Sequence, residues 1–186
     1  MPLSEPAGRE LLHRRDIVVK GYRRTDGLFD IEAEIADAKA FPITLGDRGT
    51  LEAGAKLHLM RLRLTVDATL TIIAAEAVTE AGPFSACPGG AMSFAGLAGL
   101  RIRAGFMRDA MVRIGGVAGC THIRELVQQM ATVAIQTLFG QQSDRRGDAE
   151  IAARMVDSCH SYAADGPVVQ RRWPALYTGA DRAAAD

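Results

Sequence analysis

The chain has 186 residues, of which 24% are charged and 48% hydrophobic, and its formal net charge is +0. This length suits one domain with a short appendage, and the apolar fraction excludes wholesale disorder. Zero net charge argues against a dedicated nucleic-acid-binding protein, which would carry a basic excess. The N-terminus lacks the apolar stretch of a secretory signal, and no run approaches the ~18 apolar residues of a membrane helix. We therefore expect a cytoplasmic protein with reduced thiols and no membrane partner.

The first half of the chain has the period of β-strands. Hydrophobic residues alternate with charged ones most clearly between Phe29 and Ile35, after the hairpin signal Asp26-Gly27. Pro42 and several glycines predict a loop over residues 41–55. Strands are predicted over four segments: residues 16–24, 28–38, 57–66 and 70–79.

After residue 82 the hydrophobic spacing becomes helical. Helices are predicted over residues 88–100, with Cys87 as the N-cap, and over residues 106–114, 121–139 and 148–163. Strands followed by helices indicate the α+β class, with an antiparallel sheet of about four strands covered on one face by the C-terminal helices. We expect a loose arm (1–15), one α+β domain (16–140), and a C-terminal helix and tail (141–186) packed on the same domain. Trp173 and Tyr177 would dock the tail.

The side chains able to do acid–base, nucleophilic or metal chemistry are few, because the chain has only three cysteines and four histidines. Cys87 and Cys120 each precede a predicted helix, where the helix dipole lowers the pKa of a thiol. His58 has the parity of the apolar face of its strand, and His122 follows Cys120. If the helices cover that face, these four residues converge on one pocket. The alternative is that both thiols pack as small hydrophobic groups and His58 is a hydrogen-bonded core residue.

Two thiols and two imidazoles also form a sensible tetrahedral zinc set, namely Cys87, Cys120, His58 and His122. Their linear spacing matches no standard zinc signature, so we leave open whether the site has no cofactor or a divalent metal, zinc or iron. Cys159 lies on the apolar stripe of the last predicted helix and is expected in the core. The role of His160, its neighbour, stays open, and His13 is expected to be a solvated part of the arm.

Two clusters could bind an anionic substrate group. Tyr22 and Arg23 lie in the first predicted hairpin, and Arg101 and Arg103 flank Ile102 after the first predicted helix. Guanidinium groups clamp carboxylates and phenolates, although exposed arginines more often form surface ion pairs. Motifs for dinucleotides, for nucleoside triphosphates and for serine hydrolases are absent.

Several stretches resemble a bacterial family of unknown function, DUF2889. They include Gly21–Glu32, with the run Tyr22-Arg23-Arg24-Thr25-Asp26-Gly27, and Gly119–Ile123, with Cys120-Thr121-His122. The remaining matching stretches are residues 12–15, 57–60, 157–160 and 165–169. The resemblance covers nearly the whole chain, but the family implies no established activity.

Residues 57–138 more distantly resemble the iron–sulfur scaffold fold of the NifU-like and SufE-like group. The turn at Val66-Asp67 and the positions of Cys87 and Cys120 carry this resemblance. It implies that His58, Cys87, Cys120 and His122 gather at one end of the sheet. The first scaffold cysteine would fall near Lys56, whose ammonium cannot ligate a metal, and this puts cluster assembly in doubt.

Together these features predict a small-molecule enzyme, a cofactor-independent or metal-assisted lyase acting on a small phenolic or carboxylated compound. One histidine of the pair His58 and His122 would act as general base and the other as acid, while Cys120 and the helix start stabilise negative charge. The alternatives are a metal-binding or iron–sulfur delivery protein and a non-catalytic structural protein. The expected partner is a small-molecule substrate, with a homodimer as a further option.

Overall fold

The computed structural model describes residues 2–142, 152 and 155–179. The chain divides into two compact units, residues 1–138 and 139–186. None of the helices in the described part of the chain combines the length and the apolarity needed to cross a bilayer.

Four antiparallel strands form the main sheet of the first unit, in the order β1-β2-β5-β6. Each strand end lies within three residues of the prediction, because the alternation of hydrophobic and charged residues marks strands that bury one face. The predicted α+β class with a four-stranded antiparallel sheet is confirmed. The strands are β1 (His13–Arg23), β2 (Phe29–Lys39), β5 (Lys56–Val66) and β6 (Ile72–Ala81).

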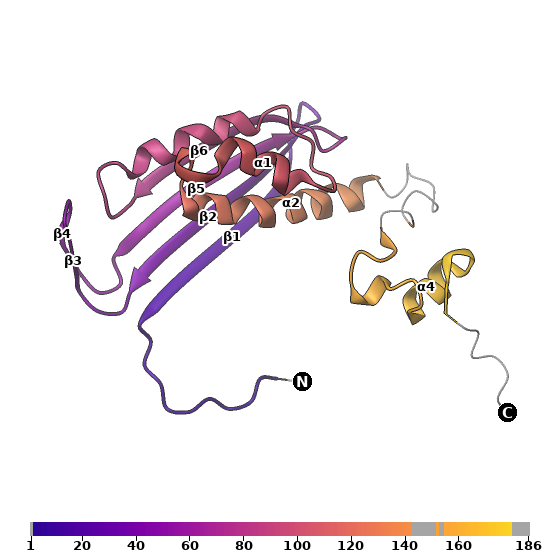
Figure 1. Cartoon of the computed structure of the whole chain (residues 1–186), viewed down its shortest axis with the longest axis horizontal. Helices are drawn as coiled ribbons and strands as arrows, with labels where there is room; N and C mark the ends of the chain where they lie inside the picture. The colour runs from indigo at the N-terminus through magenta and orange to yellow at the C-terminus, as the bar shows by residue number, and fades with distance from the viewer. Residues whose placement is uncertain (1, 143–151, 153–154, 180–186) are drawn as a thin grey trace. The chain divides into compact units, whose positions relative to one another are not determined.

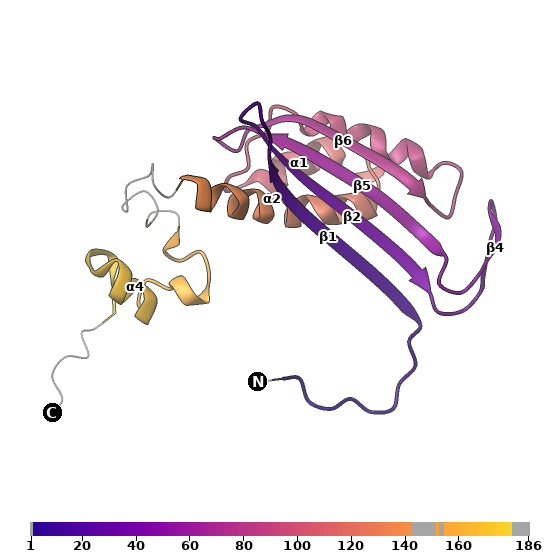
Figure 2. The same cartoon turned by 180° about the vertical axis from the view of Figure 1, so that it is seen from behind.

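Helical segments of the first unit cover one face of this sheet (Figure 1), and none of the described helices of that unit lies on the other face (Figure 2), which is called the bare face below. Side chains from alternate positions of β2 and β5, such as Ile35 and Met60, meet Ile123 and Met130 of the longest helix in one fully buried core. The helical segments are η1 (Cys87–Leu97), α1 (Phe106–Ile114), η2 (Gly116–Ala118) and α2 (Thr121–Gln142).

Two predictions for the first unit are wrong. The expected α-helix over residues 88–100 is the 3₁₀ segment η1, and Ala86 rather than Cys87 is its N-cap. Glycines at positions 89, 90 and 96 disfavour an α-helix there. The expected loop over residues 41–55 contains a hairpin of two three-residue strands, β3 (Ile43–Leu45) and β4 (Gly49–Leu51), which are too short to show alternation.

The β3–β4 hairpin lies at the end of the sheet where β5 begins and β6 ends. Arg48 donates hydrogen bonds to the carbonyl oxygens of Lys56 and Gly82, and Asp47 accepts two from Ser85. These contacts tie the hairpin to the same end of the sheet as the site described below.

The second unit has a small core of its own, in which Trp173 packs with Ala152 and Val169. Its elements are η3 (His160–Tyr162), α4 (Pro167–Arg172) and η4 (Pro174–Leu176). The docking of residues 141–186 on the first domain stays a prediction.

The predicted helix over residues 148–163 ends early: Ala152 and Met155 are helical, but the prediction is wrong beyond Met155. Beyond Met155 the chain turns, with a positive φ of 59° at Asp157 and an extended backbone at Cys159. Because the helical stripe ends there, Cys159 is exposed and does not join a core. Residues 148–151 and 153–154 lie outside the described residues.

Candidate functional site

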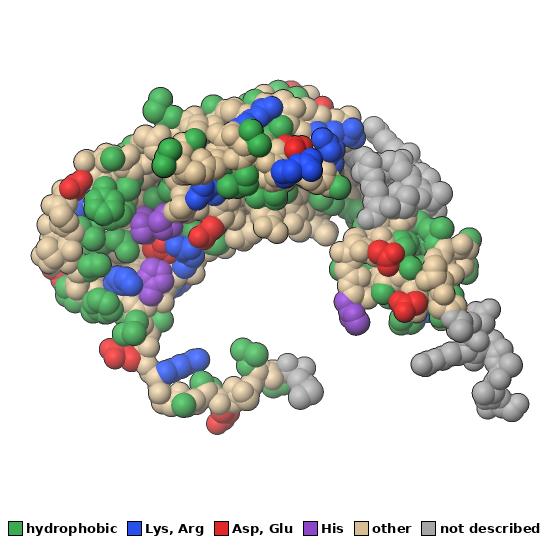
Figure 3. Space-filling view, in the orientation of Figure 1, with side chains coloured by type: hydrophobic (Ala, Val, Ile, Leu, Met, Phe, Trp, Pro, Cys, Tyr) green, Lys and Arg blue, Asp and Glu red, His purple; other side chains and the backbone are tan. Residues whose placement is uncertain are grey.

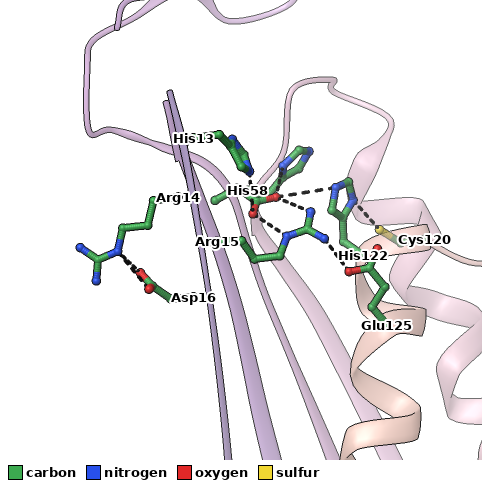
Figure 4. Close-up of polar contacts among 9 residues, drawn as sticks. His13, Arg14, Arg15, Asp16, His58, Cys120, His122 and Glu125 are labelled. Atoms are coloured by element: carbon green, nitrogen blue, oxygen red, sulfur yellow. Dashed lines mark hydrogen bonds and ion pairs between the residues drawn. The ribbon is translucent and has the colours of Figure 1, made fainter. Parts of the chain in front are cut away.

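Polar side chains from four elements meet at one end of the sheet (Figure 4). In an antiparallel sheet the start of β1, the end of β2 and the start of β5 lie side by side. The register places Arg15 opposite Asp37, and Asp37 opposite His58. The start of α2 brings Cys120 and His122 to the same place.

Asp37 is the centre of this cluster. Its side chain is 1% exposed, and both of its carboxylate oxygens accept hydrogen bonds from Arg15, at 2.7 and 2.8 Å. Arg15 also donates to Glu125 of α2 at 2.5 Å, so one guanidinium links the sheet to the helix. Burial alone would raise the pKa of Asp37, but the hydrogen bonds and charge of Arg15, helped by His58, outweigh burial and lower this pKa to about 2. The carboxylate is therefore ionised at neutral pH.

His58 is held by this carboxylate. It is only 9% exposed, which confirms that its side chain points to the core side of the sheet. Its Nδ1 lies 2.9 Å from Oδ2 of Asp37. Burial and the nearby His122 lower the pKa of His58, while Asp37 acts in the opposite direction. We assign the proton to Nδ1, which donates to the carboxylate and leaves the lone pair on Nε2.

His122 stacks against His58, with ring centroids 3.8 Å apart and planes tilted by 31°. Its Nε2 lies 3.8 Å from Oδ2 of Asp37, and its Nδ1 lies 3.8 Å from Sγ of Cys120. Burial, and after it the charge of Arg15, lower the pKa of His122. The site thus holds two adjacent imidazoles that are neutral at pH 7.

A third imidazole, His13, also faces Asp37, which corrects the prediction that His13 is a solvated part of a loose arm. It begins β1, and its Nε2 lies 3.5 Å from Oδ1 of Asp37. Histidine side chains reach the surface of the first unit beside basic, acidic and apolar groups (Figure 3). The cluster of His13, Arg15, Asp37, His58, Cys120 and His122 is called the histidine site below.

The predicted substrate-binding residues lie elsewhere, whereas Cys87 lies at the same end of the sheet as His58, because Gly82 follows Ala81, which pairs with Leu59. Cys87 sits beside Gly82, where an added Cβ would lie 2.9 Å from its Sγ. Tyr22 has the parity of the bare face of the sheet. Arg23 lies opposite Phe29 in the pairing of β1 with β2. Arg101 donates a hydrogen bond to the carbonyl oxygen of Thr69, and Arg103 forms an ion pair with Asp109.

These last three arginines lie at the opposite end of the sheet from the histidine site. Phe29 is opposite Val66, and eight residues separate Val66 from His58 along β5, which corresponds to about 26 Å. Of the predicted site residues, the structure therefore brings together His58, Cys120 and His122.

Sequence reasoning missed Asp37 and Arg15. The sequence did contain a signal for Asp37. It lies on the same strand face as the hydrophobic residues Phe29, Ile31 and Ile35, and a carboxylate on a buried face needs a charged or hydrogen-bonding partner. The sequence contained no such signal for Arg15, because its strand was predicted to begin one residue later. Only the register between β1 and β2 pairs it with Asp37.

The donor set of Asp37, His58 and His122 could hold a divalent metal ion, since one ligand atom of each lies within 4.8 Å of the others. Two imidazoles and a carboxylate are a familiar metal-binding set. However, Arg15 occupies both oxygens of Asp37, and a guanidinium beside the site opposes a second cation. The same contacts suit proton transfer, because they fix the carboxylate that orients His58.

The lowered histidine pKa values predict a pH dependence of stability. The unfolded chain, with histidine pKa near 6.5, binds more protons than the folded chain as pH falls below about 7. The free energy of unfolding should therefore be constant above about pH 7 and fall as pH drops through the folded pKa values. The contribution of Asp37 is lost only between its unfolded pKa of 3.8 and about 2.

Urea unfolding at about pH 7.5, 6 and 5 measures this effect. We expect His122→Gln to reduce the fall between about pH 7.5 and 5, because one neutral buried imidazole is removed. Equal stability of the wild type at these three pH values would contradict the lowered pKa values.

The protein is thus an α+β domain with an antiparallel sheet. Its buried carboxylate, Asp37, contacts histidines from the sheet and one from a helix. The chain matches the family of proteins of unknown function DUF2889 over residues 13–136, and it belongs to that family. No curated protein matches the chain, and no solved structure does. The likeness to the iron–sulfur scaffold fold therefore stays a prediction.

Proposed function

We propose that the protein is a small-molecule enzyme that uses His58 and His122 for acid–base catalysis, and that it is a lyase. One observation carries the proposal: a buried, ionised Asp37 holds Nδ1 of His58 at 2.9 Å while His122 stacks on the same ring. A carboxylate that fixes the tautomer of a histidine makes the second ring nitrogen a competent base.

In this proposal His58 accepts a proton at Nε2 and Asp37 stabilises the imidazolium that forms. His122 is more exposed than His58, with 24% of its side chain accessible against 11%, so its protonated form, a minority at pH 7, is placed to donate a proton to the leaving fragment. Exchange with water then deprotonates His58 and reprotonates His122. One proton is taken up and one is delivered, so a bond in the substrate can break without a redox partner. Cys120 lies beside His122 and can stabilise developing negative charge.

The start of α2 supports a substrate with a carboxylate or phenolate group. Backbone N–H groups in the first turn of a helix lack intrahelical partners and attract anions. The first turn of α2 begins at Thr121, includes His122, and has no acidic residue to satisfy those groups. In this proposal the turn takes the role that the sequence suggested for Tyr22, Arg23, Arg101 and Arg103.

A metal-binding protein is the second candidate, favoured by the short distances among Asp37, His58 and His122. Zinc or iron would be the metal, and iron–sulfur delivery is its more specific form. Arg15 weighs against a metal at Asp37, and among the described residues the group with donor atoms within 4.8 Å of one another contains neither predicted thiol.

A turnover screen separates the two candidates. The wild type, purified without added metal, is incubated with a panel of small phenolic and carboxylated compounds, and cleavage products are followed by NMR. We expect cleavage that survives chelator treatment, with less than about 0.1 equivalent of zinc or iron per chain. Activity that disappears with chelator and returns with zinc would contradict acid–base catalysis without a metal, as would stoichiometric metal without turnover.

We also propose a cytoplasmic location. The three cysteines, Cys87, Cys120 and Cys159, are all free thiols, as expected in a reducing compartment.

A further inference from the structure

The strand β1 forms an open edge of the main sheet. It is 11 residues long, contains no proline, and pairs with β2 without a register shift. Within the described residues, β2 is its one neighbour in the sheet. A long regular edge strand presents a row of unpaired N–H and C=O groups, which is a template for a further strand.

The backbone hydrogen bonds show which residues of β1 face that open edge. Arg24 donates its N–H to the carbonyl of Leu28, and Ala40 donates its N–H to the carbonyl of Leu12. In an antiparallel pair, residues alternate between those bonded to the partner strand and those directed away from it. Even-numbered residues of β1 therefore bond to β2. Odd-numbered residues, from His13 to Arg23, direct their backbone groups outward.

We propose that β1 pairs antiparallel with β1 of a second copy of this chain, with Val18 opposite Val18 of the partner. Two four-stranded sheets would then join into one of eight strands. In this register odd-numbered residues bond to odd-numbered residues, as the direction of their backbone groups requires. We infer a second copy as the partner because the charged residues Asp16 and Lys20 of β1 lie opposite residues of the other sign when two copies of the strand pair in this register.

The charges of β1 select this register. With Val18 at the centre, Asp16 lies opposite Lys20 of the partner, and the symmetry makes this pair twice. A slip of two residues one way sets Arg14 opposite Lys20, and a slip the other way sets Arg15 opposite Arg23. Opposite charges across a strand pair stabilise it and like charges destabilise it. A lysine on an edge strand usually opposes pairing with another strand, but here the carboxylate of Asp16 in the partner neutralises the charge of Lys20.

The side chains at the centre fit as well. Val18 is 47% exposed although it lies mid-strand, and pairing would cover it with its own copy. On the helix-covered face, Arg15 lies opposite Gly21 of the partner, which has no side chain to obstruct the guanidinium that holds Asp37. An apolar centre flanked by complementary charges is a common composition for a protein interface.

This arrangement would add a residue to the histidine site. His13, which faces Asp37, lies opposite the partner's Arg23. A guanidinium from the second copy would then sit beside the imidazoles and could bind an anionic substrate group. This role of Arg23 rests on the proposed function, whereas the strand pairing does not.

Sedimentation equilibrium of charge-swap variants tests the pairing. We expect the wild type to have twice the 19.9 kDa mass of one chain. Asp16→Lys and Lys20→Asp should each raise the dissociation constant about tenfold or more, because each creates two like-charge pairs. The double variant should restore the wild-type value. Both residues lie on the bare face, away from the core, and circular dichroism checks that each variant is folded.

A wild type that stays monomeric at about 100 μM would overturn the proposal, because a dimer that matters in a cell should form at that concentration. A dimer that neither single variant weakens, or that the double variant fails to restore, would also overturn it, because another surface would then be responsible. These measurements need no substrate, so failure of the pairing and failure of the proposed function are separate results.

Discussion

Replacing Asp37 by asparagine is expected to lower the free energy of unfolding by about 3 kcal/mol, the largest effect of any polar substitution in the histidine site. The change removes the charge that pairs with Arg15, and the amide cannot accept from Arg15 and His58 as the carboxylate does. Because the carboxylate raises the pKa of His58, its loss should also lower that pKa further. Urea unfolding at pH 7.5 and an NMR titration of the imidazoles measure the two effects.

Asp30→Asn is the matched control for Asp37→Asn. Asp30 lies on the same strand and accepts a hydrogen bond from Thr65 at 2.7 Å and a long one from the exposed Arg24 at 3.5 Å, but it does not contact a histidine. We expect Asp30→Asn to cost no more than about 1.5 kcal/mol, because an asparagine oxygen can still accept from Thr65 and the exposed contact with Arg24 contributes little, and to leave the pKa of His58 unchanged. Equal losses of stability in the two variants would show that Asp37 has no special role.

Glutamine at His58 or at His122 is expected to lower kcat/KM by about 10²–10⁴, the usual contribution of a positioned acid or base. Glutamine keeps hydrogen-bonding capacity but cannot exchange a proton in this pH range. The double variant should lose little more than the worse single variant, because the two residues act as one unit. Steady-state kinetics on the compound found in the turnover screen give these values.

His160→Gln is the control for the two histidine variants, since His160 is exposed and lies in the second unit. It should leave kcat/KM unchanged. Full activity in His58→Gln and in His122→Gln would contradict the proposed roles. A loss of activity that follows a loss of folded protein would instead indicate a structural role for these histidines.

The strands could be predicted from the sequence because their hydrophobic residues alternate. The same parity placed His58 on the core side, where the structure confirms it. Two members of the site, Cys120 and His122, could be predicted because the preceding glycines mark the start of a helix. These signals are local, and each is read within one segment of the chain.

The centre of the site could not be predicted in this way. The pairing of Arg15 with Asp37 depends on the register of two strands, and the pairing of Asp37 with His58 depends on a second register. Arg101 and Arg103 looked like substrate ligands because they flank one apolar residue. They lie far from His58 because antiparallel strands carry the chain to the opposite end of the sheet. The distance between these arginines and His58 is set by the order and direction of the strands, which the local sequence pattern does not reveal.

The central claim is that His58 is a neutral base held by an ionised Asp37, and ¹⁵N NMR of the imidazoles between about pH 5 and 8 tests it most directly. The two ring nitrogens report the tautomer, and their titration reports the pKa. We predict a proton on Nδ1, a lone pair on Nε2 at pH 7.5, and a pKa below the ordinary 6.5 that rises in His122→Gln. A charged ring at pH 7.5, or a proton on Nε2, would contradict the proposed acid–base site.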